Sequence, residues 1–176
     1  MRGAARRRPP DSLSAPPFVL TALTEEDWPV EVALSATPDV VAWTYYPAGL
    51  DEQAARERIG RQRQRAAQGI ARRYVLWDAA GTELGTCGIG ALDAAEPEVF
   101  YALLPAARGR GAATSAVLAL VEWARSVGCA TVALKTIEGN AASERVARRA
   151  GFTCSGGSVE EQHGRPVRLL RWTRVT

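Results

Sequence analysis

Residues 101–117, "YALLPAARGRGAATSAV", place an apolar strand pattern, a loop rich in glycine and arginine and an apolar helix pattern one after another. After Gly111, apolar side chains recur at a spacing of three and four as far as Ala124, which predicts a helix with one buried face. Backbone amides at the start of a helix form a binding site for phosphate. The stretch therefore predicts a strand, a phosphate-binding loop and a helix.

The flanking segments predict a single mixed α/β domain. One helical crossover follows the quoted loop, whereas a hairpin turn at 79–82 joins two earlier strands, so we expect a largely antiparallel sheet with one parallel crossover. A short helical piece is also expected around Val40 and Trp43, after Pro38. The strand patterns span 18–23, 73–78, 83–90, 98–104, 129–137 and 166–175, and the main helix patterns span 24–36, 51–68, 112–127 and 140–152.

The composition is that of a soluble globular domain. The chain has 176 residues, of which 47% are hydrophobic and 23% charged, and this length suits one domain. The three cysteines are odd in number and form no CxxC pair, and there is a single histidine, His163. These counts argue against a disulfide framework and against a metal site. No segment has the pattern of a signal peptide or a membrane span, so we expect a cytoplasmic protein.

The first 16 residues, "MRGAARRRPPDSLSAP", are expected to form a flexible tail, with the domain at 17–176. Four of the 22 basic residues lie in the first ten positions, which leaves 18 basic against 19 acidic residues in the remainder. A nearly neutral body argues against nucleic-acid binding. The arginines at 56, 58, 61, 63 and 65 fit a solvated helix face, with contact to an acidic substrate as the alternative.

Three ligand classes use glycine-rich turns before a helix. A Walker loop needs GxxxxGK[ST], which is absent. A dinucleotide-binding turn needs GxGxxG, but Thr114 stands at the third glycine position, and only one β-α-β unit could follow. A coenzyme A pyrophosphate is the third class. Gly109 and Gly111 permit close approach of the backbone, and Arg108 and Arg110 supply positive charge.

The segment Arg108-Gly109-Arg110-Gly111-Ala112-Ala113 resembles the [QR]-x-x-G-x-[GA] signature of the Gcn5-related N-acetyltransferases (GNATs). Downstream, "NAAS" (140–143) and "AGF" (150–152) resemble the N-x-x-S and GF segments of the RimJ/RimL-type branch, which acetylates ribosomal-protein N-termini. "EPEVFYALLPAARGRG" (96–111) is similar to the strand and loop of that branch, with Phe100 at the usual glycine. The resemblance covers about residues 18–175 and implies a sheet whose central strands splay apart.

The resemblance implies acetyl-CoA as donor, no metal, and direct transfer of the acetyl group to a primary amine. Residues 108–113 would bind the pyrophosphate. Leu103, Leu104 and Asn140 would bind the pantetheine arm, and the Ser143 hydroxyl would lie near the sulfur. Asn140 is also a good helix N-cap, and both roles are compatible.

For the proton of the amine, Glu98 is the first candidate base, because it matches an acidic position of the branch. Glu138 and Glu96 are weaker candidates, and the alternative for Glu98 is an exposed carboxylate at a strand end. The resemblance places Trp28, Trp43 and Tyr45 in the segment that builds the acceptor pocket, with core packing as the alternative for Trp28.

The sequence thus predicts an N-acetyltransferase that acts on a small amine, such as an antibiotic, or on a protein N-terminus. A catalytically silent acyl-CoA-binding module and, more remotely, a dinucleotide-binding protein are the alternatives. The sequence leaves open the acceptor, the acyl length and whether the chain forms a homodimer.

Overall fold

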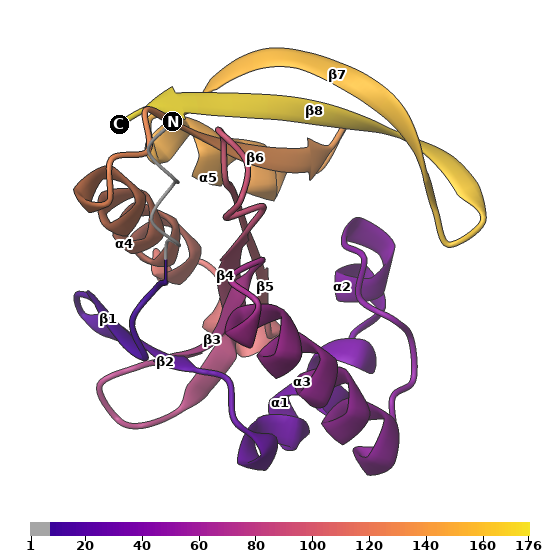
Figure 1. The fold of residues 1–176 in the computed structure, drawn as a ribbon. Helices are drawn as coiled ribbons and strands as arrows, with labels where there is room; N and C mark the ends of the chain where they lie inside the picture. Colours follow the sequence, from indigo (N-terminus) through magenta and orange to yellow (C-terminus); the bar gives the residue numbers. More distant parts are fainter. Residues whose placement is uncertain (1–7) are drawn as a thin grey trace.

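The computed structural model describes residues 8–176, and it folds them around one eight-stranded sheet. The strand order is β1-β2-β3-β4-β5-β6-β8-β7. Figure 1 shows the sheet with helices on both faces. The strands are β1 (Ser12–Ala15), β2 (Phe18–Ala22), β3 (Arg72–Trp77), β4 (Glu83–Gly90), β5 (Glu98–Leu103), β6 (Thr131–Ile137), β7 (Thr153–Gln162) and β8 (Arg165–Val175).

The helices form two groups, on opposite faces of the sheet (Figure 1). One face packs α4 (Ala112–Ser126) and α5 (Ala141–Arg149) into the larger core, and the other packs α1 (Trp28–Ser35), α2 (Pro38–Trp43) and α3 (Glu52–Ala67) into a smaller one. The alternation of side chains along β3 divides its residues between the two: Tyr74 and Leu76 belong to the larger core, and Val75 to the smaller. Short 3-10 turns at Glu25–Asp27 and Pro105–Ala107 precede α1 and the loop before α4.

The centre of the sheet is split, as the predicted fold class requires. Every strand pair is antiparallel except β5 with β6, which pair in parallel only at Glu98↔Ala133 and Val99↔Leu134. Beyond Val99 the two strands diverge, so the edge of β5 that faces β6 runs on without a β6 partner. The prediction of a mixed, mostly antiparallel sheet with splayed central strands is confirmed.

Two strands were not predicted. Ser12–Ala15 pairs with β2, with Leu13 opposite Leu20, so this part of the expected tail is corrected to a strand. Residues 1–7, with most of the arginine run, lie outside the described residues. The other missed strand is β7, which is polar and mostly exposed along its length. Its stability comes from the backbone ladder with β8, because few of its side chains are buried.

The structure over residues 8–176 contains no helix of the length and apolarity that a membrane span requires.

Candidate active site

A cavity of about 330 Å³ opens at the carboxyl end of β5, beside the N-terminus of α4. We call it the donor cavity. Predicted cofactor-binding residues make up much of its lining, together with side chains from α2 and α5. The predicted residues that line it are Leu103, Arg108, Gly109, Gly111, Ala112, Ala113, Asn140 and Ser143.

The loop before α4 has the shape that a phosphate group needs. Gly109 and Gly111 both have positive φ values, +74° and +81°, and a Cβ added at either would meet no atom within 4 Å. Gly111 is the N-cap of α4, and no side chain caps this helix end. The first-turn amides therefore keep their donors free, and the helix dipole favours an anion there. This loop fits a pyrophosphate.

Arg108 and Arg110 have different surroundings. Arg108 forms an ion pair with Asp39 and donates a hydrogen bond of 3.0 Å to the Leu103 carbonyl, so it crosses the donor cavity. The hydrogen bond from Arg108 holds the pKa of Asp39 below its usual value. Arg110 instead pairs with Asp78 at 3.1 Å, in the turn after β3, and does not line the cavity.

Of the two leucines predicted to face pantetheine, Leu103 lines the donor cavity and Leu104 does not. Leu104 packs against the smaller core, and its amide donates to the Leu84 carbonyl at 2.9 Å. The free edge of β5 beyond Val99 is where an extended chain could pair as an added strand.

Asn140 and Ser143 lie at the start of α5. The Asn140 side chain accepts a hydrogen bond of 3.1 Å from the Ser143 amide and thereby caps the helix. Both residues line the donor cavity. The capping role of Asn140 is confirmed, and its side-chain amide nitrogen has no hydrogen-bond partner within residues 8–176, so it can donate to a ligand.

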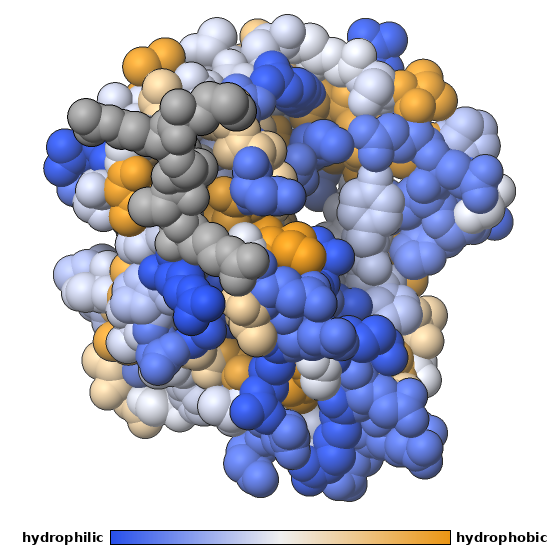
Figure 2. Space-filling view, in the orientation of Figure 1, coloured by the Kyte–Doolittle hydropathy of each residue, from blue (hydrophilic) through white to orange (hydrophobic). Residues whose placement is uncertain are grey.

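A second cavity, of about 310 Å³, adjoins the first where the central strands splay. We call it the acceptor cavity. Its walls come from the segment after α2, from β5 and β6, and from the hairpin of β7 and β8. Figure 2 shows the surface hollowed between α2 and the sheet, beneath that hairpin. The residues that line both cavities are Trp43, Thr44, Tyr101, Ala102, Asn140 and Ser143.

Glu98 lines the acceptor cavity from the first position of β5. Its carboxylate lies 3.7 Å from the Lys135 ammonium, and Lys135 also pairs with Glu160 at 3.2 Å. Burial raises the pKa of Glu98 above its ordinary value, and the Lys135 charge acts in the opposite direction. The result is a carboxylate more basic than an exposed glutamate, which suits a group that takes up a proton.

The other two candidate carboxylates lie outside both cavities. Glu138 is more than half exposed and pairs with Arg168 at 3.3 Å. Glu96 forms an ion pair with Arg171. Each carboxylate is therefore held by an arginine of β8.

Of the three aromatic residues predicted for the acceptor pocket, two line a cavity and one does not. Trp43 lines both cavities and Tyr45 lines the acceptor cavity. Trp28 lines neither; it packs against the smaller core, with the Arg56 guanidinium 5.6 Å from its ring centre. The structure therefore places Trp28 in the core, which was the alternative role.

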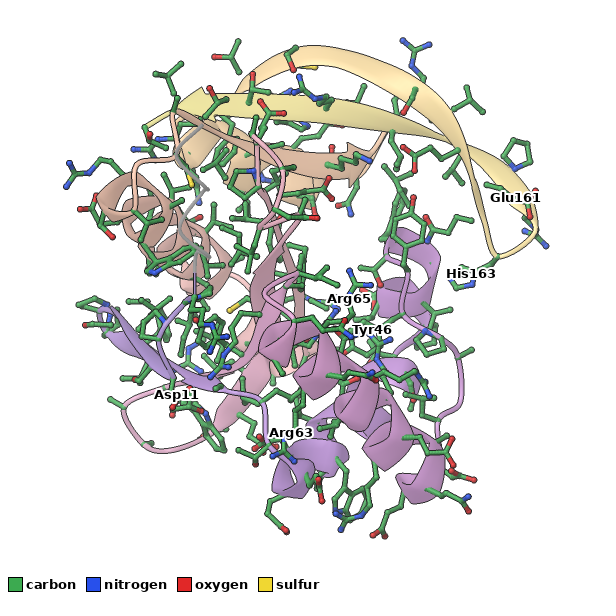
Figure 3. All side chains as sticks on the ribbon, viewed as in Figure 1. Asp11, Tyr46, Arg63, Arg65, Glu161 and His163 are labelled. Atoms are coloured by element: carbon green, nitrogen blue, oxygen red, sulfur yellow. The ribbon has the colours of Figure 1, made fainter. Side chains whose placement is uncertain are left out.

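One wall of the acceptor cavity is formed by contacts between distant parts of the chain. The Tyr45 hydroxyl donates a hydrogen bond of 3.0 Å to Glu160 of β7, and Gln162 donates to the Thr44 carbonyl. His163, at the hairpin tip, lies 3.2 Å from the same carbonyl through Nε2. Figure 3 shows His163 reaching toward the segment after α2. The β7–β8 hairpin thus closes this side of the cavity.

Tyr101 and Arg73 line the acceptor cavity but were not predicted as site residues. The Tyr101 hydroxyl is buried without a hydrogen-bond partner in the described chain. Burial raises the pKa of Tyr101 to about 12, and the neighbouring Ser143 acts in the opposite direction. For Arg73 the sequence signal is a charged residue at the first position of the strand predicted over 73–78.

Comparisons with known proteins agree with this geometry. Residues 18–153 match the family model described as Acetyltransferase (GNAT) domain. A comparison with curated proteins gave no significant match. Among solved structures, the chain is similar to the Microcin C7 self immunity acetyltransferase MccE in complex with acetyl-CoA and AMP, at 16% identity and a TM-score of 0.86, covering 97% of this chain and 99% of that one.

Two further structures show the same fold. RimL, a ribosomal L7/L12 alpha-N-protein acetyltransferase in complex with coenzyme A, matches at 19% identity and a TM-score of 0.79, covering 91% of this chain and 94% of that one. Spermidine N-acetyltransferase from Vibrio cholerae, in complex with CoA and spermine, matches at 18% identity and a TM-score of 0.76, covering 90% and 95%. The family model spans most of the chain, and the predicted family is confirmed. The chain belongs to the GNAT family and is an acetyltransferase that uses acetyl-CoA.

Proposed function

We propose that this enzyme transfers the acetyl group of acetyl-CoA to the primary amine of a small molecule bound in the acceptor cavity. The observation that carries the proposal is the meeting of the two cavities at Tyr101, Asn140 and Ser143, with Glu98 on the acceptor side. A donor and an acceptor held in adjoining cavities react without the cost of finding each other in solution.

The donor cavity supplies groups for each part of coenzyme A. The amides of the 108–113 loop and the start of α4 would bind the pyrophosphate, with Arg108 as the cationic partner. The free edge of β5 at Leu103 and the side chain of Asn140 would bind the pantetheine arm. When bound, acetyl-CoA supplies the acetyl group as a thioester.

Glu98 is proposed as the base. A free alkyl amine with a pKa near 10 is mostly protonated at neutral pH, so it must lose a proton to become a nucleophile. As the nitrogen bonds to the acetyl carbon and the carbon–sulfur bond breaks, the nitrogen becomes more acidic and releases a further proton. The first proton, from the ammonium form, is lost to solvent, and the carboxylate of Glu98, alone or through one water, would accept this second one. The electron pair of the broken bond remains on the sulfur, which then takes a proton from solvent.

Three residues with hydroxyl groups line both cavities, and Thr44 donates its hydroxyl to the Val40 carbonyl at 2.6 Å, which leaves Ser143 and Tyr101 at the junction. We propose that Ser143 donates a hydrogen bond to the sulfur as negative charge develops there. The buried Tyr101 hydroxyl, whose raised pKa keeps it protonated, is placed to support Ser143 as a donor. Glu138 has no part in this scheme, because Arg168 holds it outside both cavities.

The closed wall of the acceptor cavity favours a small amine over a protein N-terminus. The contacts of Thr44 and Tyr45 with β7 narrow the space that an extended polypeptide would need. Structural neighbours of this chain include proteins named for each kind of acceptor, the L7/L12 N-terminus for RimL and spermidine for another. The fold alone therefore accommodates both.

The test is an acceptor panel in which thiol release from acetyl-CoA is measured. We expect turnover with small primary amines and little with ribosomal-protein N-terminal peptides; the reverse order would contradict the small-amine assignment. A parallel thermal-shift series with acetyl-CoA, CoA and NAD tests the donor, since a specific ligand raises Tm by mass action. Stabilisation by acetyl-CoA without any turnover, unchanged by Glu98→Gln, would instead indicate a silent acyl-CoA-binding module.

A further inference from the structure

Arg73 is a cation without a carboxylate partner in the wall of the acceptor cavity. It forms no ion pair within residues 8–176; its one side-chain hydrogen bond runs from Nη1 to the Thr86 hydroxyl at 3.1 Å, and its buried Nε has no acceptor. Its guanidinium lies 4.8 Å from the ring centre of Phe100 and 5.6 Å from that of Tyr46. Arginine stays charged at any physiological pH, so this site carries a positive charge without a direct carboxylate partner in the described residues; the buried Glu31 is linked to it only through the hydroxyls of Tyr46 and Thr86.

A second arginine in the wall of the acceptor cavity, Arg58, does have a carboxylate partner. Arg58 of α3 also lines the acceptor cavity, and it pairs with Glu31 at 2.6 Å. Glu31 is fully buried and accepts a second hydrogen bond, of 2.7 Å, from Tyr46. Figure 3 shows Tyr46 beside α3, at the centre of the molecule. Glu31 thus forms an ion pair with Arg58, whereas no carboxylate of residues 8–176 forms one with Arg73. Buried charges in proteins are ordinarily paired.

The strand register places Arg73 and Glu98 on the same face of the sheet. Arg73 stands opposite Gly88, and Gly88 stands opposite Phe100, so the three lie in one row across β3, β4 and β5. A Cβ on Gly88 would come within 2.6 Å of the Phe100 ring, so the glycine leaves room for the stacked ring and guanidinium. Glu98 is two residues from Phe100 on the same face, which is roughly 7 Å along a strand.

We propose that the acceptor carries an oxyanion, a carboxylate or a phosphate, a few bonds from its amine, and that Arg73 binds this group while the amine lies at Glu98. The inference deepens the proposed function and rests on it. A planar guanidinium with free N–H groups matches a carboxylate or a phosphate. Elsewhere in the lining, Glu98 offers a carboxylate that attracts an ammonium group, and the neighbouring Lys135 is shared with Glu160, which lies outside the lining. The cavity is therefore complementary to a compact amino acid-like molecule.

The experiment compares acceptors in pairs that differ in the anionic group alone. The pairs are β-alanine with β-alaninamide, γ-aminobutyrate with its amide, and O-phosphoethanolamine with ethanolamine. For the wild-type enzyme we expect kcat/KM to be about tenfold to a hundredfold higher for the anionic member of at least one pair. The carboxylate and phosphate pairs distinguish the two kinds of oxyanion.

The variants assign the preference to Arg73. Arg73→Gln should lower kcat/KM for the anionic member to that of the neutral member, and Arg73→Lys should retain part of the preference. Arg72→Gln is the matched control, because Arg72 is the adjacent position of β3 and pairs with Asp11 away from the cavity. Stabilisation by acetyl-CoA in a thermal-shift assay shows that each variant is folded. If Arg73→Gln does not fold, the test rests on the ratio of kcat/KM for the anionic and neutral members of each pair, measured for Arg73→Lys and for the wild-type enzyme.

Binding of the same pairs to the CoA-saturated enzyme, measured by calorimetry, separates this inference from the proposed function. A preference in binding without turnover supports the oxyanion site and counts against the assigned catalysis. Turnover of neutral amines with no preference for anionic members leaves the acetyltransferase assignment intact and overturns the role of Arg73. A preference for anionic acceptors that survives in Arg73→Gln also overturns the role of Arg73. The same conclusion follows if the wild-type enzyme shows equal kcat/KM and equal affinity for both members of every pair, or binds neither member.

Discussion

The Glu98 carboxylate and the Lys135 ammonium lie 3.7 Å apart. Glu98 is on β5 and Lys135 on β6, the two strands that form the one parallel pairing of the described sheet, over two residue pairs. The lysine is shared with Glu160, so it does not fully neutralise Glu98. Burial therefore still raises the pKa of Glu98, and this balance leads to predictions for both activity and stability.

Replacing Glu98 with glutamine should lower kcat by about 10²- to 10⁴-fold at neutral pH, the usual contribution of a positioned base. Binding of acetyl-CoA should be unchanged, because Glu98 does not line the donor cavity. The wild-type rate should fall on the acidic side with a pKa above that of an ordinary glutamate, since only the ionised form accepts a proton. A pH–rate profile and a CoA titration measure both. A variant with wild-type rates would exclude Glu98 as base.

The same substitution should preserve or raise stability at neutral pH. A raised folded-state pKa means that the protonated carboxyl favours folding; that stabilisation is present below the unfolded pKa of about 4.3 and is lost as the pH rises through the folded pKa. Glu160 has a lowered pKa, caused first by its hydrogen bond from Lys135, so its charge stabilises the fold above the unfolded pKa. Glu160→Gln should therefore lower Tm at neutral pH. Melting curves at neutral and acidic pH give the comparison, and equal shifts for the two variants would contradict it.

Gly111→Trp should abolish binding of acetyl-CoA, because the indole would enter the open space above the loop that we assign to pyrophosphate. The positive φ of this residue adds a backbone cost of about 1–2 kcal/mol. Gly69→Trp is the matched control: Gly69 also has a positive φ, +73°, and open space around its Cβ direction, but it lies after α3 and outside the donor cavity. The assignment is supported if both variants lose a comparable amount of Tm and only Gly111→Trp loses binding of acetyl-CoA. Retained affinity would contradict it.

Asn140 and Ser143 can be separated by what each contributes to α5. Asn140→Ala removes the N-cap and should lower the free energy of unfolding by about 1 kcal/mol. Ser143→Ala leaves that cap intact, because the serine donates through its backbone amide, so it should lower kcat with little change in stability. Denaturant unfolding and steady-state kinetics distinguish the two. Loss of stability in Ser143→Ala without loss of kcat would indicate a structural serine.

A thiol reagent should modify one cysteine rapidly in the folded protein. Cys154 is exposed, whereas Cys87 and Cys129 are buried, and burial raises the pKa of Cys87 to about 12, so little thiolate is available. Counting modified thiols with and without denaturant tests this, and Cys154→Ser should remove the rapid phase. Rapid labelling of Cys87 would mean that β4 opens readily. The Cys154→Ser variant also lowers the background of the thiol-release assay.

Local sequence patterns predicted the strand, the loop and the helix that border the donor cavity. The strand, the Gly109–Gly111 loop and the helix from Ala112 are contiguous in the chain, and glycine readily adopts the positive φ values found at both loop positions. Asn140 as a helix cap is equally local. These features depend on neighbours within a few residues, so sequence spacing carries them.

The acceptor side depends on strand register and on distant contacts, which sequence spacing does not contain. Glu98 and Glu138 looked alike as acids near strand ends, but the register of β6 with β8 brings Arg168 to Glu138 and leaves Glu98 at the cavity. Arg58 belonged to an arginine row that fits solvent, yet a buried partner on α1, Glu31, draws it inward. The polar strand β7 gave no alternation of apolar residues to detect.

The β7–β8 hairpin, which closes one side of the acceptor cavity, has a consequence for how this enzyme can acquire new substrates. The family model ends at residue 153, whereas Glu160 and Gln162, which hold the segment after α2 against the acceptor cavity, lie beyond it. The region that carries family membership therefore includes the donor cavity and most of the acceptor cavity, whereas part of the acceptor boundary is built from a strand under few packing constraints. Changes in β7 can reshape amine selection while the coenzyme-binding loop and its helix stay as they are.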